Sequence, residues 1–173
     1  NHEIADNLPG KPLQPLFGGQ SNMSSSFRDY FFAEYHTHAA APNYFPQRSV
    51  RNEDYKLILS LLPNTEHPDY LDTIRKLHGD HEGRNSDHVL NIPELLASSP
   101  PIVRHAYELM RRPPEVQLYD LRKDPYEFNN LSESLDHQNI KAELLAHLHQ
   151  WRVATSDPLL KPSILRQLTK EVQ

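Results

Sequence analysis

Hydrophobic and polar positions divide the chain into short extended segments, a polar middle region and a helical end. Residues 29–35 are rich in aromatic side chains, which favours a β-strand. Residues 47–51 and 55–62 are two further predicted strands, and the tight turn at 52–54 between them allows a hairpin. The continuous apolar stretch within 55–62 indicates burial, and residues 116–121 are predicted to form a fourth strand.

Helical periodicity is clearest over residues 136–155. Apolar side chains recur there at helical spacing and form one stripe: Ile140, Leu144, Leu148 and Trp151. Shorter helices are predicted over 70–78, 92–97 and 102–111. The pattern as a whole predicts an α+β fold, in which a small antiparallel sheet of about four strands packs against a long C-terminal helix. The core should join this helix to the sheet through Leu144, Leu148 and Trp151.

Proline and glycine mark the segments in which regular structure cannot continue. Residues 1–26 carry several of both and are predicted to form a connecting arm, whose apolar side chains would pin it to a partner. We expect the α+β domain to span 27–157, with 63–114 as an insertion between strands. Residues 158–173 follow as a tail that carries an amphipathic patch at Ile164, Leu165 and Leu168.

Length and composition fit one polar globular domain with its own core, since the chain has 173 residues, 37% hydrophobic and 24% charged. The formal net charge of −5 and the lack of a basic stripe argue against nucleic-acid binding. No apolar run is long enough to span a bilayer. The absence of cysteine excludes disulfides, cysteine nucleophiles and thiolate metal sites. The chain starts at Asn1 without a methionine or a visible signal peptide, which is compatible with a processed or excised product.

Histidine is abundant, with 11 residues, and raises the question of a metal site. One segment combines histidines with carboxylates: His78, Asp80, His81, Glu82, Asp87 and His88. Its spacing matches no recognised ligand pattern, so we interpret it as a solvated polar loop. A metal-dependent hydrolase that uses this loop is kept as an alternative. His147 and His149 fall on different faces of the long helix and cannot bind a metal together.

Several segments resemble those of type I sulfatases. Residues 115–131, EVQLYDLRKDPYEFNNL, resemble the ELYDLxxDPxExxNL segment near the C-terminus of these enzymes. Residues 8–16, LPGKPLQPL, resemble the LPGxSLxPLL phrase that follows their catalytic α/β domain. Residues 31–38 and 43–51, FFAEYHTH and NYFPQRSVR, resemble the FAEYxxH and YYPMRSVR stretches of heparan N-sulfatase-like (N-sulfoglucosamine sulfohydrolase-like) enzymes.

The resemblance implies the C-terminal subdomain of an alkaline-phosphatase-like sulfatase, which hydrolyses sulfate esters or sulfamates of sulfated glycans, with 63–114 as a subgroup-specific insertion. Sulfatases use calcium and a formylglycine made from a Cys/Ser-x-Pro/Ala-x-Arg motif. The nearest segment, 98–102, lacks the arginine, and no N-terminal Asp-Asp strand end is present. We therefore expect no catalytic residue, metal ligand or cofactor in this chain, which alone should be inactive. Its partner would be the N-terminal catalytic domain of a periplasmic, secreted or lysosomal protein.

The resemblance also implies candidate substrate-binding residues. In the heparan N-sulfatase-like subgroup the loop after the first C-terminal strand reaches over the active-site cleft, which makes His36, His38 and Arg48 candidates for contacting an anionic sugar. Arginine offers a planar fork that suits sulfate or carboxylate. Alternatively, Arg48 pairs with a nearby carboxylate such as Glu34, and the two histidines are ordinary rim residues. A second hypothesis for the whole chain is a stand-alone module that binds a sulfated glycan or a protein, although the apolar arm at 8–17 favours the sulfatase subdomain.

Overall fold

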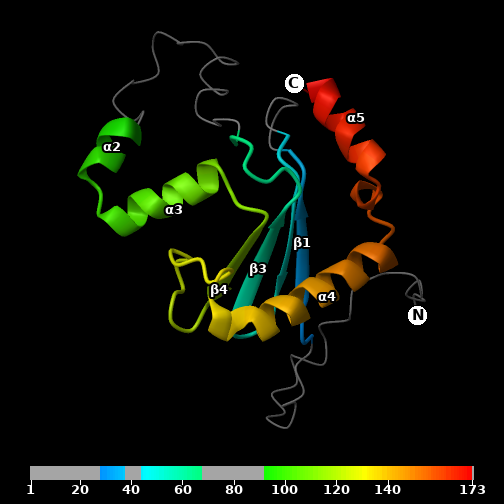
Figure 1. The fold of residues 1–173 in the computed structure, drawn as a ribbon, viewed down its shortest axis with the longest axis horizontal. Helices are drawn as coiled ribbons and strands as arrows, with labels where there is room; N and C mark the ends of the chain where they lie inside the picture. The colour runs from blue at the N-terminus through cyan, green and yellow to red at the C-terminus, as the bar shows by residue number, and fades with distance from the viewer. Residues whose placement is uncertain (1–27, 38–43, 68–91, 173) are drawn as a thin grey trace, which may run out of the picture.

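The computed structural model describes residues 28–37, 44–67 and 92–172, and Figure 1 shows how their elements are arranged. The strands form one antiparallel sheet in the order β1-β2-β3-β4: β1 (Phe31–Tyr35), β2 (Gln47–Arg51), β3 (Tyr55–Ser60) and β4 (Val116–Asp120). The predicted strands are confirmed, and so is the hairpin of β2 and β3. The third strand is shorter than predicted, because the turn that contains Pro63 begins directly after Ser60.

The described part of the chain contains these α-helices: α2 (Ile92–Ser98), α3 (Pro101–Arg111), α4 (Gln138–Ala154) and α5 (Pro162–Val172). The helices predicted over 92–97, 102–111 and 136–155 are confirmed. The last of these begins later than predicted, because a 3₁₀ turn at Leu135–His137 precedes the regular α-helix. None of the described helices is long and apolar enough to cross a membrane.

Some of the predicted segments lie outside the residues that the structure describes. The arm at 1–26 and the helix predicted over 70–78 lie outside the described residues. The predicted tail contains a 3₁₀ turn at Pro158–Leu160, followed by α5, which carries the amphipathic patch. The division at residue 157 and the role of 63–114 as an insertion stay predictions.

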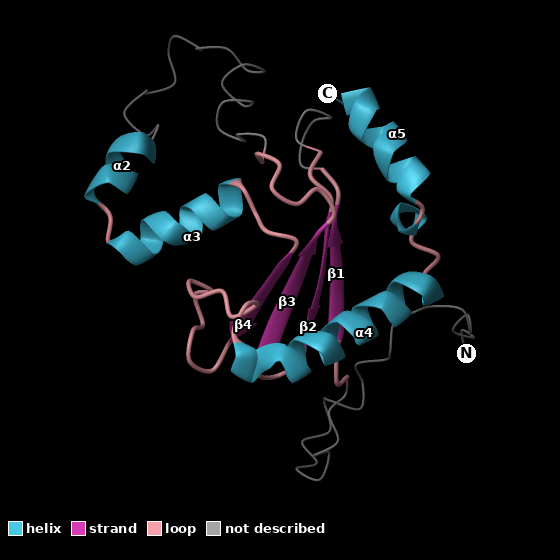
Figure 2. Cartoon of the chain, viewed as in Figure 1, coloured by secondary structure: helices cyan, strands magenta, loops and turns pink. Residues whose placement is uncertain are grey.

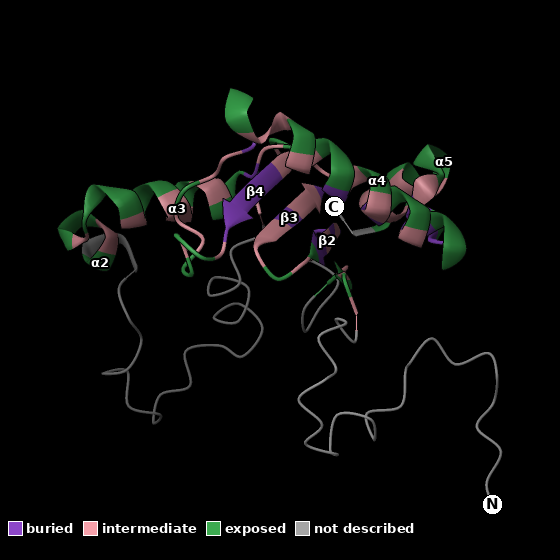
Figure 3. Cartoon of the chain, turned by 90° about the horizontal axis from the view of Figure 1, so that it is seen from below, coloured by how far each residue is buried: buried purple, intermediate pink, exposed green. Residues whose placement is uncertain are grey.

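The sheet and α4 form two layers around one core. α4 lies across one face of the sheet (Figure 2). The side chains that alternate onto this face from three neighbouring strands pack with two leucines of α4 into one buried cluster: Val50, Leu57, Leu118, Leu144 and Leu148. Figure 3 shows that β4 is buried along nearly all its length. Truncating any of these leucines to alanine should cost about 2–5 kcal/mol of stability.

The indole ring of Trp151 extends this core toward the edge strand β1. It stacks on the ring of Phe32, with centroids 5.3 Å apart and an interplanar angle of 2°. The side chain is only partly buried. Trp151 therefore joins α4 to the sheet as predicted, but at the margin of the core rather than at its centre.

The sulfatase-like motif at 115–131 forms β4 and a closed loop that returns to it. The side-chain Oδ1 of Asn130 accepts hydrogen bonds from the N–H groups of Leu118 and Ser132, at 2.9 and 3.0 Å. Glu127 adopts a positive φ of 59°. Both oxygens of its carboxylate accept hydrogen bonds from Lys56 Nζ, at 2.9 and 2.7 Å. The polar residues of the motif thus fix the loop against the sheet, which is a structural role.

Candidate functional site

The candidate residues lie at the end of the sheet where β1 finishes and β2 begins. His36 directly follows β1, and Arg48 lies opposite Glu34 in the register of the two strands. The N–H of Phe45 donates to the carbonyl oxygen of His36 at 2.7 Å. This bond brings both ends of the intervening loop together on a rigid sheet edge. His38 belongs to the part of that loop outside the described residues.

Arg48 is buried completely, with 0% of its side chain exposed. Its Nε and Nη2 donate to the two carboxylate oxygens of Asp157, at 2.9 and 2.8 Å. Its Nη1 donates to the backbone carbonyls of Gln47 and Tyr35, at 2.8 and 3.4 Å. The guanidinium is thus surrounded by acceptors from the protein itself. Arg48 is one of the candidates for contacting an anionic sugar, and in the described structure its guanidinium faces acceptors of the protein and has no exposed surface.

The main partner of Arg48 is Asp157, not the neighbouring carboxylate that sequence proximity suggested. Glu34 Oε2 lies 3.7 Å from Arg48 Nη2 and is half exposed, whereas only 1% of the Asp157 side chain is exposed. Arg152, near the end of α4, adds a third member, since its Nε donates to Asp157 Oδ2 at 2.7 Å. The same carboxylate caps the next turn by accepting from the Leu159 N–H at 3.0 Å. These contacts fasten the corner between α4 and α5 to β2.

The electrostatics of the cluster favour an ionised Asp157. Burial by itself would raise the pKa of this carboxyl. The hydrogen bonds from Arg48 and Arg152, together with the N–H of Leu159, outweigh burial and hold the pKa well below its usual value. The negative charge of Asp157 is therefore retained across the whole neutral and mildly acidic range, which keeps both guanidinium groups paired.

His36 is the described candidate that reaches the surface. About a third of its side chain, 36%, is exposed. Its Nε2 lies 3.1 Å from Arg48 Nη2 and 3.7 Å from Glu34 Oε2. The imidazole thus sits over the buried arginine at the sheet edge, where it can present a ring nitrogen to a neighbouring molecule.

A small hollow lies on the sheet face opposite α4, and most of its lining side chains alternate away from the face that carries Arg48 and Val50. It measures about 170 Å³ and is bordered by Glu34, Tyr35, Gln47 and Arg48 among others. Ligand pockets of enzymes usually measure about 300–1,000 Å³. This hollow is therefore smaller than a usual ligand pocket.

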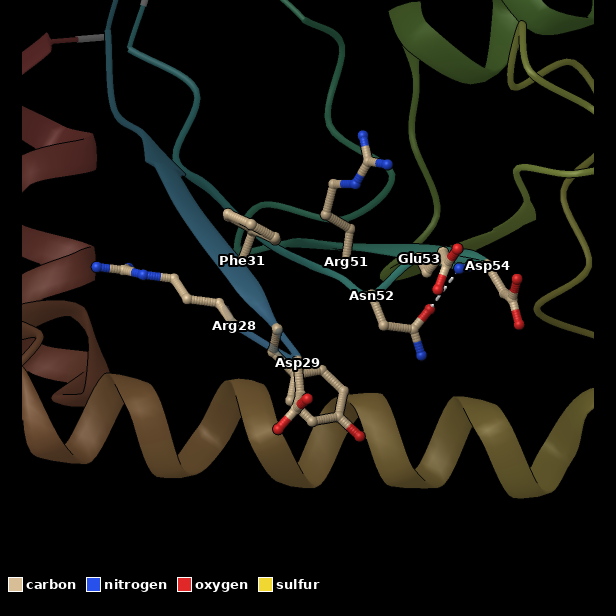
Figure 4. A pocket seen from close by; sticks show the side chains of 8 residues that line it. Arg28, Asp29, Phe31, Arg51, Asn52, Glu53 and Asp54 are labelled. Atoms are coloured by element: carbon tan, nitrogen blue, oxygen red, sulfur yellow. Dashed lines mark hydrogen bonds between the residues drawn. The ribbon is translucent and has the colours of Figure 1, made fainter. Parts of the chain in front are cut away.

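Two larger hollows lie elsewhere and suit a sulfated ligand less well. The first, of about 720 Å³, is at the opposite end of the sheet, around the turn between β2 and β3 (Figure 4). It mixes arginines with carboxylates, so it gives no net attraction for an anion; its charged residues are Arg28, Asp29, Arg51, Glu53 and Asp54. The second, of about 420 Å³, lies between α3 and the sheet face that α4 leaves open, and its lining is mainly aromatic and apolar.

Neither a metal nor a formylglycine fits the described residues. No group of three or more metal-ligating side chains occurs in the described ranges. The serines at the end of α2, which come nearest to the formylglycine motif, bond back to their own helix, since Ser98 Oγ and Ser99 Oγ both donate to the carbonyl of Leu95. The histidine-rich segment at 78–88 lies outside the described residues.

Comparisons with known proteins find sulfatases that are similar to this chain in sequence or in fold. No protein-family profile matches the sequence. The chain is 25% identical over 118 residues to the ulvan-active sulfatase of Formosa agariphila, an alignment that covers 66% of this chain and 19% of that enzyme. Two solved structures share the fold. The 2-O GAG sulfatase BT1596 has a TM-score of 0.53 and 19% identity, over 90% of this chain and 22% of its own. BT4656, solved with its substrate D-glucosamine-2-N,6-O-disulfate, has a TM-score of 0.54 and 16% identity, over 92% of this chain and 23% of its own.

This is the fold of the C-terminal part of a sulfatase. The sequence resemblance to that part of sulfatases is thereby confirmed, and the predicted α+β architecture is confirmed with it. The chain spans about a fifth of the length of the curated sulfatase it matches. The heparan N-sulfatase-like subgroup stays a prediction.

Proposed function

We propose that this chain is the C-terminal portion of a sulfatase that hydrolyses sulfate esters or sulfamates of sulfated glycans. In this proposal it completes one side of the substrate cleft and stabilises the catalytic domain. The observation that carries the proposal is the sheet edge at His36, where a loop closed by the Phe45 hydrogen bond is anchored over a buried ion cluster. His36 is partly exposed at this edge, and in the complete enzyme the catalytic domain would form the other side of the site.

Known proteins of the same fold support a glycan as the substrate class. The curated relative is ulvan-active, and BT4656 was solved with a disulfated glucosamine. The FAEYHTH and RSVR stretches of this chain further favour the heparan N-sulfatase-like subgroup, whose substrates are N-sulfated sugars. We propose this subgroup on those stretches alone.

The proposal divides the candidate residues by role. His36 and His38 are the side chains that contact the sugar or its sulfate. Arg48 takes part indirectly, because its guanidinium is buried and bonded to Asp157 while one N–H group reaches His36. It is a positioning residue rather than a ligand for sulfate.

The reactive groups belong to the rest of the enzyme in this proposal. Formylglycine would supply the nucleophile and calcium would bind the sulfate oxygens, and the residues described above fit neither. The purified chain alone should therefore turn over neither an aryl sulfate nor an N-sulfoglucosamine substrate. Turnover by the isolated chain would contradict the proposal that the reactive groups lie in the rest of the enzyme.

The experiment that tests the proposal is a pair of kinetic measurements on the complete sulfatase that contains this chain. His36→Ala should lower kcat/KM for a sulfated glycan by about tenfold or more, the scale of one lost hydrogen bond to a charged group. A small aryl sulfate should be affected less, because it lacks the sugar groups that this edge would hold. His149→Ala, the same change at an exposed position of α4, is the matched control. If His36→Ala left glycan kinetics unchanged in a folded enzyme, the proposed contact would be wrong.

A further inference from the structure

A continuous chain of polar contacts joins the end of α4 to the candidate histidine. Arg152 Nε donates to Asp157 Oδ2 at 2.7 Å, and Arg48 binds the same carboxylate through Nε and Nη2 at 2.9 and 2.8 Å. The Nη2 of Arg48 then lies 3.1 Å from Nε2 of His36. Every member except His36 is buried to 8% exposure or less. The chain therefore has little freedom to rearrange.

The chemistry of this last contact determines where the histidine carries its proton. A guanidinium group has only N–H donors and no acceptor. Nε2 of His36 must therefore accept the hydrogen bond, and it can do so only when it is unprotonated. A neutral imidazole with an unprotonated Nε2 carries its proton on Nδ1.

The other charged groups around the ring do not reverse this assignment. Glu34 is the one described carboxylate in contact with it, and its Oε2 lies 3.7 Å from Nε2, beyond the usual range of an N–H···O hydrogen bond. Glu34 is also 54% exposed, so water screens its charge. A second positive charge on the ring would face the Arg48 guanidinium directly. The Asp157 carboxylate is already shared by Arg48 and Arg152.

We infer that Arg48, held by Asp157 and Arg152, fixes His36 as a neutral imidazole whose Nδ1–H is the donor offered to a ligand. Within the described ranges the polar contacts of the ring are made by Nε2, and 36% of the side chain is exposed. A neutral donor of this kind suits an oxygen acceptor, such as a sulfate oxygen or a sugar hydroxyl. The identity of that ligand rests on the proposed function, whereas the position of the proton does not.

Two residues that lie far from the sheet edge in the sequence take part in this arrangement. Asp157 and Arg152 act on His36 only through Arg48, so they are positioning residues. The network orients the ring and selects its tautomer before a ligand arrives, which lowers the cost of ordering on binding. Histidines in metal sites are oriented in a similar way by the partner of their second ring nitrogen.

The test is a long-range ¹H–¹⁵N correlation spectrum of the ¹⁵N-labelled chain at neutral pH, which distinguishes protonated from unprotonated ring nitrogens. The His36 signals are assigned by their loss in His36→Gln. The expected spectrum has a protonated Nδ1 and an unprotonated Nε2 for this residue. A protonated Nε2, or an averaged pair typical of free histidine, would overturn the inference.

Variants separate the network from a general effect on the fold. Arg48→Lys removes the planar fork, so the His36 signals should shift toward the averaged pattern. Arg51→Gln changes an exposed arginine of the same strand and should leave them unchanged. If Arg48→Lys fails to fold, the wild-type spectrum still tests which ring nitrogen of His36 carries the proton. If the tautomer is as inferred but His36→Ala leaves glycan kinetics unchanged, the proposed function fails while the network stands.

Discussion

Replacing Asp157 by asparagine removes the buried negative charge that two buried guanidinium groups share. The side chains of Arg48 and Asp157 are 0% and 1% exposed, and that of Arg152 is 9% exposed. An asparagine of nearly the same shape could still accept one hydrogen bond but could not balance either charge. Breaking a buried ion pair by removing one partner typically costs about 3–5 kcal/mol.

The stability that Asp157 gives the fold depends on pH. The pKa of Asp157 in the folded chain lies below its ordinary value, because the hydrogen bonds from Arg48 and Arg152 outweigh the effect of burial. A carboxyl whose folded-state pKa is lowered stabilises the fold above its unfolded-state pKa of about 3.9, and this stability is lost as pH falls toward the folded-state pKa. The difference in unfolding free energy between wild type and Asp157→Asn should therefore be constant from pH 7 to about 4 and shrink only below that.

The assay is urea denaturation followed by circular dichroism, at several pH values, with unfolding free energies from linear extrapolation. Asp136→Asn, the same change at an exposed position, is the matched control and should stay within about 0.5 kcal/mol of wild type. A cost below about 1 kcal/mol for Asp157→Asn at pH 7 would refute the argument that this carboxylate holds the corner between α4 and α5 against β2.

Two further substitutions test the packing and the motif loop. Trp151→Ala should lower the free energy of unfolding by about 2 kcal/mol, since the ring is stacked on Phe32 but only partly buried. The control Val153→Ala, at an exposed site of the same helix, should change stability little. Equal effects of the two substitutions would contradict the assigned orientation of α4. Asn130→Ala should cost about 1–3 kcal/mol because two backbone N–H groups lose their acceptor. Asn129→Ala, at the adjacent exposed position, should cost much less.

The secondary structure could be predicted because its signals are local. Aromatic and β-branched residues in short runs gave the strands, and one apolar stripe at helical spacing gave α4. The end of β3 was predicted too late, since an apolar run alone does not distinguish a strand from the buried start of a turn. The motif at 115–131 indicated the class of protein, and its side chains serve to close the loop after β4.

The ion cluster could not be predicted from the same signals. Arg48 and Asp157 are separated by 109 positions, and no periodicity connects two such distant residues. In the sequence Asp157 directly precedes Pro158, and one of its carboxylate oxygens caps the 3₁₀ turn that follows. A partial signal did exist in β2. Arg48 and Val50 alternate onto the same face, so a buried Val50 already implied that Arg48 points toward α4.

The central claim is that the sheet edge at His36 forms one wall of a sulfated-sugar site in a sulfatase. The most direct measurement is a crystal structure of the complete enzyme with a sulfated glycan bound in its active-site cleft. We predict that a ring nitrogen of His36 lies within hydrogen-bonding distance of the glycan, about 2.7–3.2 Å, or reaches it through one water molecule. A bound glycan whose nearest atom is separated from this sheet edge by other parts of the enzyme would contradict the claim.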